Sequence, residues 1–308
     1  MSLSIVFPGQ GSQAVGMMSD LAERHSLVKD LFIEASDVLG TDLWALTQEG
    51  PIEQLSQTEN TQPALLTAGV ASWRVWQSLG GTTPAMMAGH SLGEYTALVS
   101  AGALSFANGV ALVRDRGRYM QAAVPTGEGG MAAILGLEDD KVREVCAQAA
   151  QGDVLQAVNF NAPGQVVIAG SAAAIERGIE QLKAAGARRA LPLPVSIPAH
   201  SSLMSSASAR LAERIASISI EMPAIPVLHN CNVEVASNAE QIAQNLVSQL
   251  DSPVRWVESI QAMQQAGVDS FVESGPGRVL GGMIKRIVSD VSIACIEKPD
   301  AFDALINA

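Results

Sequence analysis

The chain has 308 residues, of which 48% are hydrophobic and 16% are charged, and its formal net charge is -12. This length and hydrophobic content suit one large globular domain, alone or with a smaller one attached, and they exclude wholesale disorder. The acidic balance excludes nucleic acid and anionic membranes as general partners.

The sequence contains no targeting or membrane signal. Residues 1–11 lack a basic segment, and Pro8 interrupts their apolar run, so we expect no signal peptide. No apolar run reaches the length of about 18 residues that a membrane span needs. The three cysteines are scattered and odd in number, which indicates neither a disulfide framework nor a metal site. We therefore expect a cytoplasmic protein.

The first 125 residues alternate short apolar strands with longer helical patterns. "SIVF" at 4–7 predicts a buried strand, and "AMMAG" at 85–89 predicts a second one that is too short for a helix. The predicted helices of this part are at about 20–40, at 61–79, directly after Ser91, and at 105–123 with Ser105 as N-cap.

The stretch "PTGEGG" at 125–130 resembles a hinge, and a different pattern follows it. The predicted order is strand 131–136, helix 139–150, strand 154–159, strand 165–170, helix 171–186 and strand 188–193. This βαββαβ order is typical of a ferredoxin-like unit.

Strand and helix alternation resumes after the proline-rich segment 192–198. The predicted elements are a strand at 225–229, helices at 238–250 and 253–266, a strand at 269–273 and a helix at 277–288. We therefore predict an α/β protein in which residues 1–125 and 196–308 form one discontinuous domain. A small α+β subdomain at 126–195 is inserted into it.

The pentapeptide "GHSLG" places Ser91 between a predicted strand and a predicted helix. This strand–turn–helix context is what a nucleophile elbow needs, with Gly89 and Gly93 leaving room for the sharp turn. The backbone N–H of Leu92 would then face an oxyanion at the helix N-terminus. The alternative interpretation is an ordinary Gly-Ser turn.

A nucleophilic serine needs a base, and the chain has four histidines. His25 falls on a polar helix, and His90 adjoins the serine, where neighbouring side chains diverge. His200 and His229 remain as candidates, and the loop position of His200 favours it. No carboxylate is in an obvious position to orient either one.

Arg116 lies on the apolar face of its predicted helix, whereas Arg114 and Arg118 lie on the opposite face. The apolar side chains within roughly 60° of it, at about 100° per residue, are Leu112, Val113, Tyr119, Met120 and Ala123. A buried guanidinium needs an anionic partner. That partner is either a structural Asp or Glu, or a substrate carboxylate held in bidentate fashion.

The N-terminal loop "FPGQGSQA" loosely fits a dinucleotide-binding fingerprint. That interpretation needs a second strand ending in an acidic residue about twenty positions later, where the sequence predicts a helix instead. The loop can equally direct backbone N–H groups at an oxyanion near Ser91.

Several motifs together resemble the malonyl-CoA:acyl carrier protein transacylase family. They occur in order along essentially the whole chain and are "FPGQGSQ", "GHSLGEY", "RG" with Arg116, "NFNAPGQVVIAG", "PAHSSLM" with His200, and "ESGPGRVL". The resemblance implies a stand-alone acyltransferase of bacterial fatty acid synthesis, with an α/β-hydrolase-like core and a ferredoxin-like insert.

The resemblance also implies a role for individual residues. The nucleophile falls on Ser91 and the base on His200. The oxyanion hole falls on the backbone N–H groups of Gln10 and Leu92, and Gln10 also contacts substrate. The arginine that holds the malonyl carboxylate falls on Arg116. The main-chain carbonyl that orients the histidine falls on Gln249, which would explain the absence of a third catalytic carboxylate.

The implied reaction is a ping-pong transfer from malonyl-CoA, through malonyl-serine, to the phosphopantetheine thiol of acyl carrier protein. The resemblance implies no tightly bound cofactor and no metal, and a monomer is the expected form. Because the carrier protein is expected to be acidic, docking needs a local basic patch. The candidates are Arg188, Arg189, Lys285 and Arg286, although an ordinary solvated surface would also carry such charges.

Two other functions are compatible with parts of the sequence. A serine esterase or thioesterase of the α/β type would carry its catalytic histidine late in the chain. Here the last histidine, His229, is followed by 79 further residues. Such a hydrolase also has no need for a buried Arg116. A carrier-protein or acyl-CoA binding module without turnover would not need both Ser91 and His200.

Overall fold

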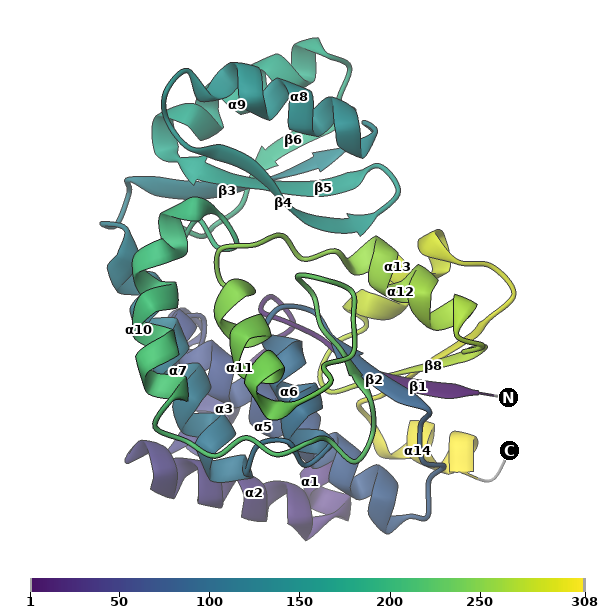
Figure 1. The fold of residues 1–308 in the computed structure, drawn as a ribbon. Helices are drawn as coiled ribbons and strands as arrows, with labels where there is room; N and C mark the ends of the chain where they lie inside the picture. Colours follow the sequence, from purple (N-terminus) through teal and green to yellow (C-terminus); the bar gives the residue numbers. More distant parts are fainter. Residues whose placement is uncertain (1, 307–308) are drawn as a thin grey trace.

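The computed structural model describes residues 2–306 and contains two β-sheets with separate helical layers (Figure 1). The larger sheet is parallel, in the order β7-β2-β1-β8-β9. Its strands are β1 (Leu3–Phe7), β2 (Met86–Gly89), β7 (Val227–Leu228), β8 (Ser270–Ser274) and β9 (Ser292–Ile296). Ile5 and Phe7 of β1 belong to one hydrophobic core and Val6 to another, so this central strand is buried on both faces.

Helices cover both faces of the parallel sheet. The helices that share the core of Ile5 and Phe7 are α1 (Ser19–Arg24), α2 (Ser26–Leu39), α3 (Leu43–Glu49), α4 (Ile52–Leu55), α5 (Thr58–Ser78), α6 (Leu92–Ser100), α7 (Phe106–Ala123), α10 (Ser205–Ile215), α11 (Ala239–Ser248) and α14 (Pro299–Ile306). On the opposite face, α12 (Trp256–Gln265) and α13 (Val279–Ile287) pack around Val6.

The smaller sheet is antiparallel, in the order β4-β5-β3-β6. Its elements are β3 (Gly129–Leu135), α8 (Asp139–Ala150), β4 (Leu155–Ala162), β5 (Gln165–Ser171), α9 (Ala172–Ala184) and β6 (Arg189–Pro192). Figure 1 shows α8 and α9 on its outer face, with the rest of the molecule beyond the inner face. On that inner face Met131, Val158 and Val167 form a small apolar cluster with Ala199 of the segment that returns to the larger part.

Backbone hydrogen bonds join the smaller sheet to the larger part near α12. The Phe160 N–H donates to the Val254 carbonyl at 3.0 Å, and the Val254 N–H donates to the Val158 carbonyl at 2.8 Å. Strand β4 is therefore held beside the loop that precedes α12, which places its residues next to the site described below.

The element order predicted for the segment from β3 to β6 is confirmed, and most other predicted elements are present within a few residues. One prediction was wrong: the helix expected at about 20–40 is divided at His25, whose backbone is extended (φ -133°). The strand expected at 225–229 is limited to Val227–Leu228. The elements α3, α4, α10, β9 and α14 were not predicted from the sequence.

No helix within residues 2–306 has the length and apolar character needed to cross a membrane. The cysteines at 146, 231 and 295 are free.

Candidate active site

Ser91 occupies a strained turn between β2 and α6. Its backbone has φ 52° and ψ -107°, a left-handed φ that non-glycine residues rarely adopt. A Cβ atom on Gly89 would lie 1.9 Å from the backbone of Gly93, and one on Gly93 would lie 2.1 Å from the Phe7 carbonyl oxygen. Both glycines are therefore required by close backbone approach, and the turn presents the Ser91 side chain at the carboxyl end of the strand.

His200 lies within hydrogen-bonding distance of the serine. Its Nε2 is 2.8 Å from Ser91 Oγ, and its Nδ1 is 2.7 Å from the Gln249 carbonyl oxygen. Because a carbonyl only accepts, Nδ1 carries the proton and Nε2 is free to accept from the serine hydroxyl. Burial and then the nearby Arg116 charge lower the pKa of His200 to about 3, so this histidine is neutral at ordinary pH.

Arg116 is buried, with 1% of its surface exposed, and its hydrogen-bond acceptors are neutral. One guanidinium nitrogen, Nη1, donates to Gln62 Oε1 at 2.9 Å. The other, Nη2, donates to Gln249 Oε1 at 3.0 Å and to Ser91 Oγ at 3.2 Å. The third, Nε, has no partner among the described residues. Of the two alternatives from the sequence, a salt bridge to a structural carboxylate is therefore not formed within residues 2–306.

Ser91, His200 and Arg116 line one pocket of about 160 Å³ together with Gln10 and Leu92. Leu92 is the first residue of α6, so its N–H has no acceptor within the helix. Apolar side chains from the smaller sheet and from the segment that follows it complete the wall, including Met131, Val167, Val195 and Ile197. The pocket thus combines a hydroxyl, an imidazole and a buried cation with largely apolar walls.

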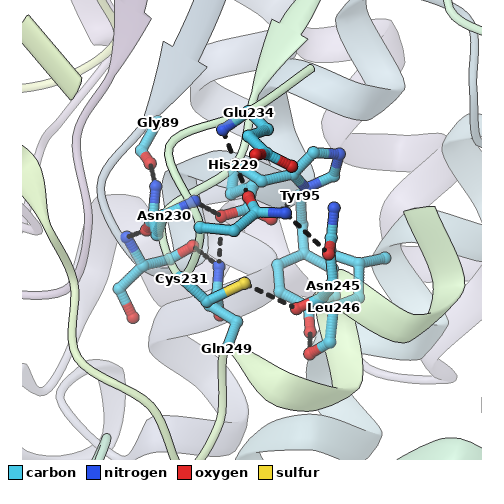
Figure 2. Close-up of polar contacts among 12 residues, drawn as sticks. Gly89, Tyr95, His229, Asn230, Cys231, Glu234, Asn245, Leu246 and Gln249 are labelled. Carbon is cyan, nitrogen blue, oxygen red and sulfur yellow. Dashed lines mark hydrogen bonds and ion pairs between the residues drawn. The ribbon is translucent and has the colours of Figure 1, made fainter. Parts of the chain in front are cut away.

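His229 lies in a different environment from His200. It is also buried, but its Nδ1 lies 2.7 Å from a carboxylate oxygen of Glu94. The prediction that no carboxylate orients either histidine was therefore wrong for His229. Figure 2 shows His229, Asn230 and Gln249 gathered in one polar cluster.

Glu94, Asn230 and Gln62 are buried polar neighbours of this site that were not identified from the sequence. A signal for Glu94 was present, because it is a charged residue between Gly93 and Tyr95 in an otherwise apolar helix, the same kind of pattern that singled out Arg116. Asn230 and Gln62 are uncharged and carry no comparable signal.

The remaining two histidines are outside the proton path of the serine. His90 Nε2 lies 2.7 Å from Asn161 Oδ1 of β4, and its ring meets Trp256 edge to face. Burial lowers the pKa of His90. This contact ties the turn beside Ser91 to the smaller sheet, whereas His25 separates α1 from α2 on the far side of the large part.

The four basic residues proposed for docking are exposed, and two of them, Arg188 and Arg286, lie near the β4–β5 hairpin. Arg286 donates to the Pro163 carbonyl and to the side chain of Gln165 at the β4–β5 turn. The side chain of Arg188 lies beside Gly136, whose N–H donates to the Gly164 carbonyl of the same turn at 2.8 Å. Arg189 and Lys285 are adjacent to these two in the chain.

Within the described residues, no group of three or more His, Cys, Asp or Glu side chains could hold a metal ion.

Comparison with known proteins places the chain in one family. The acyl transferase domain family matches residues 5–296. The malonyl CoA-acyl carrier protein transacylase of Escherichia coli is 53% identical over 304 residues, which cover 99% of this chain and 98% of that protein. The corresponding protein of Bacillus subtilis is 43% identical over 306 residues, covering 99% and 96%.

Solved structures agree with this placement. An acyl carrier protein S-malonyltransferase from Vibrio cholerae superposes with a TM-score of 0.97 at 53% identity, covering 99% of this chain and all of that one. A malonyl-transacylase solved in complex with a type II PKS acyl-carrier protein superposes with a TM-score of 0.99 at 50% identity, covering 100% of this chain and 99% of that one. The chain therefore belongs to the acyl transferase family and, within it, to the malonyl CoA-acyl carrier protein transacylases.

Proposed function

We propose that this protein transfers a malonyl group from malonyl-CoA to the phosphopantetheine thiol of acyl carrier protein, as a step of fatty acid biosynthesis. The observation that carries the substrate class is the buried Arg116, whose acceptors are neutral and whose Nη2 lies 3.2 Å from Ser91 Oγ. A guanidinium held in this way can bind a carboxylate two carbons away from an acyl carbon under attack by the serine.

In the first half-reaction, Ser91 is the nucleophile and His200 the general base. Ser91 Oγ attacks the thioester carbonyl carbon while its proton passes to His200 Nε2, 2.8 Å away. The backbone N–H groups of Gln10 and Leu92 stabilise the oxyanion. The carbon–sulfur bond then breaks, and the proton passes from Nε2 to the sulfur, so that coenzyme A leaves as a thiol.

The second half-reaction uses the same groups in reverse. The phosphopantetheine thiol gives its proton to His200 and its sulfur attacks the malonyl-serine ester. When the bond between the acyl carbon and Ser91 breaks, Oγ recovers the proton. The Gln249 carbonyl holds the imidazole in the required tautomer throughout, at 2.7 Å from Nδ1, in the place that a carboxylate takes in other serine enzymes.

The basic cluster of Arg188, Arg189, Lys285 and Arg286 is proposed as the docking surface for an acidic carrier protein. Its support is the exposure of all four residues and the contact of Arg286 with the turn between β4 and β5, two strands that also line the pocket through Asn159 and Val167. We propose that the enzyme acts as a cytoplasmic monomer without a bound cofactor, with malonyl-CoA and the carrier protein as its substrates.

We also propose a finer description of the fold. Residues 1–125 and 196–308 form a discontinuous α/β-hydrolase-like catalytic domain, and residues 126–195 form a ferredoxin-like subdomain. The βαββαβ order and the separate hydrophobic core of the smaller sheet support this division.

The proposal is tested by measuring the intact mass of the protein after exposure to malonyl-CoA, with the Ser91→Ala variant as control. We expect a malonyl adduct on the wild type and none on Ser91→Ala, with the adduct lost on addition of pantetheine as malonyl-pantetheine forms. A hydrolase would release malonate instead, and a binding module would form no adduct. Either result would contradict the proposed transfer.

A further inference from the structure

A buried carboxylate behind the pocket has no part in the reaction described above. Glu94 of α6 is fully buried and accepts hydrogen bonds from three donors. These are His229 Nδ1 at 2.7 Å, the Asn230 backbone N–H at 2.9 Å and Gln249 Nε2 at 2.9 Å. The apolar side chains of the same helix lie in the large core.

Glu94 is connected to the Arg116 guanidinium by hydrogen bonds through the Gln249 side chain. The Gln249 side-chain amide donates from Nε2 to Glu94 and to the Ser91 carbonyl, and its Oε1 accepts from Arg116 Nη2. An amide has one donating end and one accepting end, and a carboxylate only accepts. Glu94 therefore fixes which way the amide faces, so that oxygen rather than nitrogen is turned toward Arg116.

Glu94 is also connected to the serine turn, through Asn230. Asn230, whose N–H is held by Glu94, accepts from the Ser91 N–H at 2.7 Å through Oδ1 and donates to the Gly89 carbonyl at 2.7 Å through Nδ2. The two amide ends thus hold both sides of the strained turn. A strained backbone persists only where its surroundings define it strongly.

The opposite charges of Arg116 and Glu94 are separated by the side-chain amide of Gln249. Arg116 and Glu94 do not touch, but each binds a different end of the Gln249 side chain. Burial lowers the pKa of Arg116, and the charge of Glu94 is among the influences that oppose this. The amide therefore lets a buried anion balance the cation without occupying the guanidinium face that a substrate carboxylate needs.

We propose that Glu94 is a positioning residue for acyl-group selection, acting through Gln249 on Arg116 and through Asn230 on the Ser91 turn. The proposal rests on the proposed function, since it assumes that Arg116 binds the substrate carboxylate. If Glu94 had no such role, replacing it would change only the folding stability of the protein.

The direct test is Glu94→Met, which keeps a similar size but removes both acceptor oxygens. Gln249 Nε2 and the Asn230 N–H then lose this acceptor, and the Gln249 amide is free to turn its nitrogen toward Arg116. A buried donor without a partner costs enough to change a rate by about 10- to 100-fold. We expect the ratio of kcat/KM for malonyl-CoA to that for acetyl-CoA to fall by this factor.

The matched control is His229→Ala, which removes another hydrogen bond of the same carboxylate but contacts neither Gln249 nor Ser91 through its side chain. We expect its melting temperature to fall while its malonyl-to-acetyl ratio stays within about twofold of the wild type. A purely structural Glu94 would give the same outcome in both variants, namely lower melting temperatures and unchanged ratios. That outcome would overturn the proposal.

A second variant keeps the test decisive if Glu94→Met does not fold. Gln249→Met removes the bridging amide but retains the main-chain carbonyl that binds His200. We expect the same fall in the malonyl-to-acetyl ratio, and an unchanged ratio would overturn the proposal. The activity of the wild type separates the two proposals. If the wild type does not transfer malonyl groups, the proposed function is contradicted. If active variants keep the wild-type ratio, only the role of Glu94 is contradicted.

Discussion

His200 and His229 are both buried in the larger part of the molecule, and each has its Nδ1 bound to an oxygen acceptor. For His229 the acceptor is the Glu94 carboxylate, the arrangement that usually marks a catalytic histidine. For His200 it is only a main-chain carbonyl, yet His200 is the one whose Nε2 reaches Ser91 Oγ. A carboxylate partner is therefore a poor guide to the catalytic histidine here, and access to the serine and the pocket is a better one.

The difference follows from the position of Arg116. A negative charge beside His200 would lie next to the guanidinium and would compete with a substrate carboxylate for it. The site instead places its carboxylate, Glu94, on the far side of the Gln249 amide. A carbonyl acceptor fixes the His200 tautomer without adding a charge.

Replacing each histidine in turn gives the largest expected contrast. We expect His200→Ala to slow formation of the acyl-enzyme by at least about 10²- to 10⁴-fold, because both half-reactions lose their proton carrier. His229→Ala should reduce stability and leave the rate of acylation close to that of the wild type. Rapid-quench acylation assays with thermal melts of both variants test this, and equal rate losses in two folded variants would remove the distinction.

The lowered pKa of His200 predicts how the stability of the protein depends on pH, which can be measured by unfolding at different pH values. Its pKa in the folded protein is lowered to about 3, with burial as the first cause and the Arg116 charge as the second. Between that value and its ordinary 6.5, the unfolded chain binds more protons, so His200 contributes a loss of stability as pH falls through this interval. Above it, both states are neutral and the contribution vanishes.

The same shift predicts the effect of removing the arginine charge. In Arg116→Ala, the acid limb of kcat/KM for acetyl-CoA should move to higher pH, toward the ordinary histidine value. Acetyl-CoA is the suitable substrate because it does not require the guanidinium. A limb that stays in place would mean that the Arg116 charge has no influence on His200.

The smallest expected effects concern the docking surface. Reversing the charges of Arg188 and Arg189, or of Lys285 and Arg286, should raise KM for the carrier protein and leave CoA exchange nearly unchanged, because rim charges act mainly on encounter. Reversal of Arg24 and Lys29, exposed on α1 and α2 at the opposite end of the molecule, is the control with the same change in charge. If KM for the carrier protein at low salt is the same in all of these variants, the proposed docking surface is contradicted.

Much of the fold was predictable because its signals are local. The two-sided burial of β1 and β2 produces continuous apolar runs, and the helices α5 and α7 are too long to be confused with strands. The break at His25 and the short elements α3, α4 and β9 were not predicted, because elements this short contain too few residues for a clear periodic pattern.

The site divides in the same way. Ser91 and Arg116 could be singled out from the sequence, one by its glycine spacing and one by its misplaced charge. The choice between His200 and His229 could not be made from residue type, because it depends on which imidazole the chain brings to the serine. The orientation of Gln249 and Asn230 was equally hidden, since amides are common at the surface and only burial gives them a defined direction.

The most direct test of the account is the selectivity of Arg116→Ala, measured as kcat/KM for malonyl-CoA and acetyl-CoA side by side with a thermal melt. Loss of a buried partner for the carboxylate costs about 3–5 kcal/mol, or roughly 10²- to 10⁴-fold in rate. We predict that malonyl transfer falls by this factor, that acetyl transfer falls little or rises, and that the protein stays folded. Parallel losses for both substrates, together with a large drop in melting temperature, would show that Arg116 is structural and would contradict the account.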